Sequence, residues 1–111
     1  MMLLFRPHHI PMIRDGRKTE SRRMWEKARV SEGSYQQVKK LIFTKEHFGY
    51  IQIRKLYRQH LLDITEESAQ REGGYMRAEY LRAFHEIYPG VGENPELWVL
   101  EFEYIGMEKV K

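Results

Sequence analysis

The sequence predicts a single α+β domain, built as a small closed or nearly closed β-barrel with helices packed on the outside. Three observations predict this fold. The chain has 111 residues, of which 41% are apolar, and this suffices for one compact core. Short segments rich in β-forming residues follow one another closely, and helical patterns are few. No repeat, low-complexity segment or linker divides residues 1–111.

The first part of the chain predicts a strand, a helix, a second strand and a turn. Met2–Arg6 is rich in β-forming residues and opens the fold. Pro7–Asp15 begins with a proline and is followed by Gly16, which is the usual punctuation of a helix. We then expect a short strand over Lys18–Arg23 and a turn or short helix over Trp25–Glu32.

The middle of the chain predicts a pair of strands. Ser34–Thr44 and Phe48–Leu61 are both rich in β-forming residues, which alternate with cations. The polar segment Lys45–His47 lies between them and predicts a hairpin loop.

Two helices and a last strand complete the predicted domain. Thr65 can cap the free amide groups of a first helical turn, and Gly73 and Gly74 end that helix. A second helix is expected over Arg77–Tyr88, where apolar residues recur on one face. Leu97–Ile105 alternates in residue type and predicts the closing strand.

Composition argues against several classes of protein. The chain has no cysteine, which excludes disulfides and thiolate metal sites and is typical of a reducing cytoplasm. The apolar start, Met1–Phe5, is too short for a signal peptide or a membrane span. The histidines lack the spacing of metal ligands, and His8 and His9 are adjacent. We therefore expect a cytoplasmic protein without a membrane contact, a metal or a cofactor.

Charge is distributed unevenly along the chain. Residues 1–60 carry a net charge of +9 and residues 61–111 a net charge of −6, which together give the overall +3. Such asymmetry indicates a basic face that meets a polyanion such as RNA. The alternative is that the two halves pair with each other across the fold.

The segment Gly16–Arg23 is the strongest functional signal. It holds a turn glycine, two hydroxyl groups, one carboxylate and four cations within eight residues. Backbone amide groups left free after a helix ends at Gly16 would hold a phosphate or an oxyanion, with Arg17 and Lys18 beside them. Arg23 can bind a phosphate or a base edge through two parallel hydrogen bonds. The alternative is a row of ion pairs on an exposed strand.

Three residues are candidates for catalysis. Lys18 could serve as the base for the hydroxyl of Ser21, although residues three apart point to opposite faces of a regular strand. Glu72 ends a predicted helix, where the helix dipole disfavours a carboxylate, and this placement indicates a partner cation or a general acid. The alternative for Ser21 is a structural serine on a strand, and the alternative for Glu72 is a solvated glutamate.

The pattern Gly-x-Lys-Thr-x-Ser-x-Arg over residues 16–23 resembles the signature of the ASCH domain family. Further similar segments are Phe5–Pro7, Val30–Gly33, Asp63–Glu66 and Val99–Phe102. The resemblance implies a PUA-like β-barrel and a link to RNA and modified-nucleoside chemistry. The ligand is then RNA or a nucleoside-like molecule, bound in a basic cleft. The candidate binding residues are Arg17, Thr19, Arg22, Arg23 and Trp25, of which Trp25 would stack on a base.

Two segments, Ala69–Glu72 and Ile87–Gly90, also resemble the small amidohydrolases of this family that act on N4-acetylcytidine. That resemblance implies Lys18 as the base, Ser21 as the nucleophile and Glu72 as the proton donor or orienting acid. Ser21 replaces the threonine of that branch and is flanked by charged residues instead of apolar ones. The alternative to a binding domain is therefore a small amidohydrolase acting on an acylated nucleoside.

Overall fold

The computed structural model describes residues 2–108 and shows a five-stranded mixed sheet with three α-helices. The strands are β1 (Met2–Leu4), β2 (Glu20–Arg23), β3 (Tyr35–Lys39), β4 (Tyr50–His60) and β5 (Glu96–Gly106). The helices are α1 (Ile10–Arg14), α2 (Glu66–Gly73) and α3 (Arg77–Ile87), with short 3-10 helices at Pro7–His9 and Leu61–Asp63. No helix in the described part of the chain is long and apolar enough to cross a membrane.

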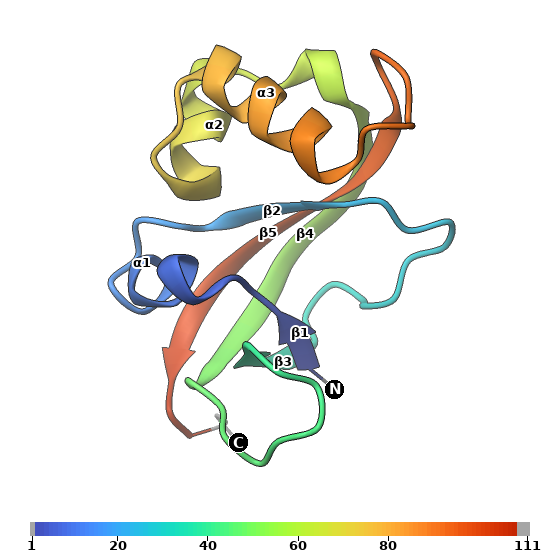
Figure 1. Ribbon diagram of the computed structural model, residues 1–111. Coiled ribbons are helices and arrows are strands. Elements are labelled where there is room, and N and C mark those ends of the chain that lie inside the picture. The colour runs from blue at the N-terminus through green and yellow to red at the C-terminus, as the bar shows by residue number, and fades with distance from the viewer. Residues whose placement is uncertain (1, 109–111) are drawn as a thin grey trace.

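The sheet has the strand order β1-β3-β4-β5-β2. The β1–β3 pair is parallel and the other pairs are antiparallel. The long strands β4 and β5 curve together through the centre, and α2 and α3 gather at one end of them (Figure 1). Within residues 2–108 the sheet is open, with β1 and β2 as its edges, so the closed barrel expected from the sequence is not seen. Closure would require pairing between these two edge strands, which have only three and four residues.

Local signals place the helices well. Thr65 caps α2 by accepting a hydrogen bond from the amide of Ser68 at 3.0 Å. Gly74 ends the same helix in the left-handed region, with φ of 77°, where a residue without a Cβ atom is favoured. The helices expected before Gly73–Gly74 and from Arg77 are therefore confirmed.

The strand expected over Ser34–Thr44 is too long. β3 ends at Lys39, and the chain then forms a loop up to β4. Leu41, Ile42 and Phe43 have β propensity, yet they are exposed in this loop, Phe43 to 96%. Trp25–Glu32 forms bends and turns without a helix.

Apolar residues form two clusters instead of the single core expected. The first packs the sheet against α1 and comprises Leu3, Phe5, Ile10, Ile13, Val38, Ile51, Ile53, Leu100 and Phe102. The second lies under α2 and α3 and comprises Leu61, Ile64, Ala69, Tyr80, Phe84 and Leu97. β5 contributes to both clusters, because its alternating side chains have a packed layer on each face. β2 lies against α2, and Glu20 and Arg22 of this strand are buried.

Candidate functional site

The turn that precedes β2 holds its own backbone amide groups. The amide groups of Arg17 and Lys18 both donate to the carbonyl oxygen of Met12, at 2.9 and 3.0 Å. The amide of Gly16 donates to Ile13 at 3.2 Å, and that of Thr19 donates to Arg71 at 2.9 Å. The expected set of free amide groups for an anion is therefore absent from this turn.

Lys18 reaches from this turn to the end of α2. Its side chain is only 3% exposed, and Nζ donates to the carbonyl oxygens of Glu20 at 2.7 Å and of Glu72 at 2.5 Å. Nζ also lies 3.6 Å from Oε1 of Glu72. Burial lowers the pKa of Lys18, the charges of Arg22 and Arg23 add to this, and Glu72 opposes it. Lys18 thus satisfies a carbonyl group that the end of a helix leaves free.

A chain of alternating charges continues from Lys18 through the interior. Nη1 of Arg22 donates to Oε2 of Glu72 at 2.9 Å and to Oε1 of Glu20 at 3.1 Å. Nε of Arg71 donates to the other carboxylate oxygen of Glu20. Arg71 is half-exposed, whereas the other four side chains are buried. Two buried cations therefore face two buried carboxylates, which is the condition under which such charges are tolerated.

Ser21 and Arg23 form a separate pair on the next part of β2. Nε of Arg23 donates to Oγ of Ser21 at 3.0 Å, and Nη2 of Arg23 donates to the carbonyl oxygen of Leu4 at 2.9 Å. The guanidinium group lies 4.9 Å from the ring centre of Phe5. Among residues 2–108 Ser21 makes no hydrogen bond to Lys18 or Glu72, so the nucleophile–base contact is not formed.

A pocket of about 350 Å³ opens between β2, α2 and α3, and five of the eight predicted site residues line it. Its polar wall contains Lys18, Ser21, Arg22, Arg23 and Glu72. Its aromatic wall contains Phe5, His9, Tyr75, Tyr80 and Tyr88. Burial and the charge of Glu72 raise the pKa of Tyr80, so this hydroxyl keeps its proton. Sequence reasoning missed the aromatic wall, although Tyr75 directly follows the two glycines that end α2.

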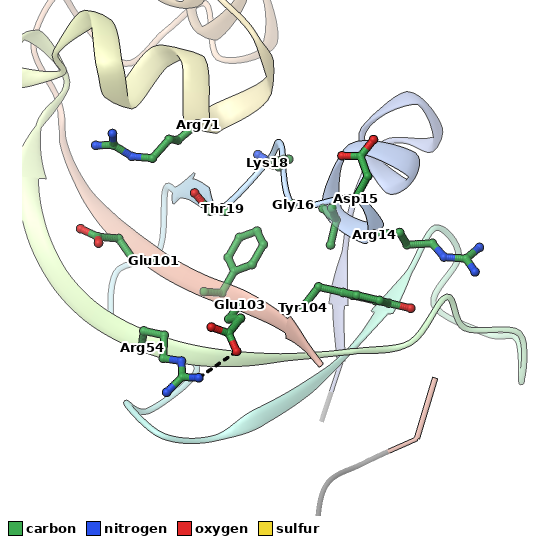
Figure 2. A pocket seen from close by; sticks show the side chains of 12 residues that line it. Arg14, Asp15, Gly16, Lys18, Thr19, Arg54, Arg71, Glu101, Glu103 and Tyr104 are labelled. Atoms are coloured by element: carbon green, nitrogen blue, oxygen red, sulfur yellow. Dashed lines mark hydrogen bonds and ion pairs between the residues drawn. The ribbon is translucent and has the colours of Figure 1, made fainter. Parts of the chain in front are cut away.

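A second pocket, of about 450 Å³, lies on the other side of the turn and also includes Lys18 and Thr19 (Figure 2). Most of its charged groups already have partners. Arg54 pairs with Glu103 at 3.0 Å, and Glu101 accepts a hydrogen bond from Tyr57 at 2.9 Å. Arg71, also in this wall, is bound to Glu20. The first pocket is therefore the better candidate site.

The remaining predicted binding residues lie outside the first pocket. Arg17 is exposed and paired with Asp15 at 2.7 Å. Thr19 lines the second pocket, and Trp25 packs against the first apolar cluster with Arg29 over its ring. Within the described residues, no group of three or more histidine, aspartate or glutamate side chains is placed to hold a metal.

The charge asymmetry along the chain has a structural explanation in these contacts. Cations from the first half meet carboxylates from the second half: Arg54 with Glu103, Arg58 with Glu96, and Arg22 with Glu72. Pairing between the two halves, the alternative kept open above, thus accounts for part of the basic excess.

Comparison with known proteins identifies the fold. No family model and no curated protein matches the chain. A solved structure from Enterococcus faecalis, of family DUF984, is 20% identical in sequence to this chain and matches its structure with a TM-score of 0.70. The match covers 100% of this chain and 86% of that protein. The solved structure of an ASCH domain from Lactobacillus crispatus is 16% identical in sequence to this chain, with a TM-score of 0.70. The match covers 86% of this chain and 69% of that protein. The chain therefore has an ASCH-like fold, as its resemblance to that family implied.

Proposed function

We propose that this domain binds RNA or a nucleoside-like ligand in the pocket between β2, α2 and α3. One observation carries the proposal: buried hydrogen-bonding groups and aromatic rings line the same pocket, which has a volume of about 350 Å³. A base presents donors and acceptors on its edge and a flat π surface on its face. The charged wall suits the edge, and the aromatic wall suits the face. The volume lies within the usual range for small-molecule sites.

Binding can be tested by NMR titration with cytidine, other nucleosides and a short single-stranded RNA. We expect shifts of the amide signals of Ser21, Tyr75 and Tyr80, which line the pocket. Signals of Arg54 and Glu103, in the second pocket, should not move. If no nucleoside or RNA shifts the pocket signals at millimolar concentration, or if the shifts centre on Arg54, the proposal is wrong.

The runner-up function is hydrolysis of an acyl amide such as that of N4-acetylcytidine. Its support is the contact between Lys18 and Glu72, together with the lowered pKa of Lys18. In this mechanism Ser21 Oγ attacks the acetyl carbonyl carbon and Lys18 accepts the hydroxyl proton. The proton then passes to the leaving amine, and water hydrolyses the acyl–serine to acetate. The ion pairs of Glu72 favour an orienting role over that of proton donor.

Catalysis requires Lys18 Nζ and Ser21 Oγ to come within hydrogen-bond distance, and in the structure each of these atoms has other partners. The test is release of acetate from N4-acetylcytidine by the wild type and by Lys18→Ala, Ser21→Ala and Glu72→Gln. We expect Lys18→Ala and Ser21→Ala to abolish turnover. Turnover that survives either change rules out this mechanism. Nucleoside binding without turnover leaves the binding function as the conclusion.

A further inference from the structure

We propose that the pocket takes a ligand carrying a single phosphate group, which Arg23 and Ser21 hold. The inference rests on the proposed function and narrows its ligand from RNA or a nucleoside to a free or terminal nucleotide. Its basis is the difference between two neighbouring arginines on β2. Arg22 contacts two carboxylates, whereas Arg23 contacts a hydroxyl and a carbonyl oxygen.

Arg23 is held ready for an anion. Two of its five N–H groups are used, by Ser21 and Leu4, and its guanidinium plane lies over Phe5. No carboxylate forms an ion pair with it among residues 2–108. Burial lowers the pKa of Arg23, but a guanidinium group keeps its charge in proteins. An ordered cation with free N–H groups at a pocket wall gains a charge-assisted hydrogen bond when a phosphate arrives.

Ser21 supplies a second donor at the same place. Its Oγ accepts the Nε–H of Arg23, so its own hydroxyl hydrogen is available to another acceptor. Both residues line the pocket, as does Arg6. Ser21 and Arg23 together therefore present hydrogen-bond donors to one oxygen-rich anion.

Three cations that a longer polyanion could use are already paired with carboxylates. A single-stranded nucleic acid needs a groove of cations along its backbone. On β4, Arg54 and Arg58 are paired with carboxylates of β5. Near the pocket, Arg71 is bound to the buried Glu20. These pairs leave Arg23 as the ordered cation without a carboxylate beside the aromatic wall.

Calorimetric binding of cytidine, cytidine 5′-monophosphate and a short oligocytidylate tests the proposal. We expect the monophosphate to bind about 10- to 100-fold more tightly than cytidine, the range of one charge-assisted hydrogen bond. Arg23→Gln should remove most of the difference in affinity between the monophosphate and cytidine. Ser21→Ala should weaken monophosphate binding severalfold and Ser21→Thr should restore it. Arg54→Gln, in the second pocket, is the matched control and should have no effect.

The outcomes distinguish failure of the proposed phosphate site from failure of the proposed nucleoside or RNA binding. Equal affinity for cytidine and its monophosphate would overturn the phosphate site and leave nucleoside binding standing. Tight oligocytidylate binding with a log–log salt slope steeper than about −2, weakened by Arg54→Gln, would overturn the single-phosphate ligand and support RNA binding. No binding of any of the three would overturn both. Equal melting temperatures of wild type and Arg23→Gln establish that the variant is folded.

Discussion

The substitution Glu20→Gln tests whether the buried charges hold the domain together. The Glu20 side chain is 1% exposed, and its two oxygens accept hydrogen bonds from Arg22 and Arg71. Glutamine has nearly the same shape but removes the negative charge, so Arg22 keeps Glu72 as its carboxylate partner and Gln59 as a neutral one. Loss of one member of a buried ion pair costs about 3 to 5 kcal/mol. Because the amide oxygen still accepts a hydrogen bond, we expect the lower end of that range.

Urea unfolding measures this loss directly. At an m value of about 2 kcal/mol per molar urea, a loss of about 3 kcal/mol lowers the unfolding midpoint by roughly 1.5 M. The matched control is Glu103→Gln, which removes the same charge from an exposed pair with Arg54. That change should cost less than about 1 kcal/mol. If Glu20→Gln costs no more than Glu103→Gln, the buried network does not stabilise the fold.

Three further changes follow from local geometry. Burial lowers the pKa of His9 from 6.5 to about 3, so the unfolded chain binds more protons between these values and stability falls as the pH drops through them. His9→Gln should flatten this fall in urea titrations at neutral and acidic pH, and an unchanged profile contradicts the assignment. Gly73→Ala would place a Cβ atom 2.9 Å from Nε2 of His9. We expect a cost of about 1 to 3 kcal/mol, whereas Gly90→Ala meets nothing within 4 Å and should be neutral in thermal melts. Thr65→Ala removes the cap on the amide of Ser68 and should cost about 1 kcal/mol; no change in melting temperature would show that the cap is dispensable.

The elements that sequence predicted well are those whose signals are local. Thr65, Gly73 and Gly74 mark the ends of α2 through hydrogen bonds and backbone angles within a few residues. The end of β3 has no such marker. Leu41–Phe43 favours strand by propensity, but the structure leaves these residues exposed, and propensity carries no information about burial.

The candidate site also contains residues that could be predicted from the sequence and residues that could not. Lys18, Ser21 and Glu72 were proposed together on family resemblance, and the structure brings all three to one pocket. The burial of Glu20 was not predicted, because a carboxylate among four cations resembles a solvated strand residue. Its partner Arg71 is 51 residues away, so only the packing of α2 on β2 brings them together.

The position of β2 has a consequence for how the domain forms. β2 is an edge strand, and its partner in the sheet is β5, with Glu20 opposite Glu101. Contacts of such large sequence separation slow folding, because a long loop has to close before they form. β2 therefore stays without its sheet partner until residues 96–106 have been synthesised. A nascent chain without residues 96–106 therefore contains the Gly16–Arg23 motif but lacks the strand that pairs with β2, whose residues Ser21, Arg22 and Arg23 line the pocket.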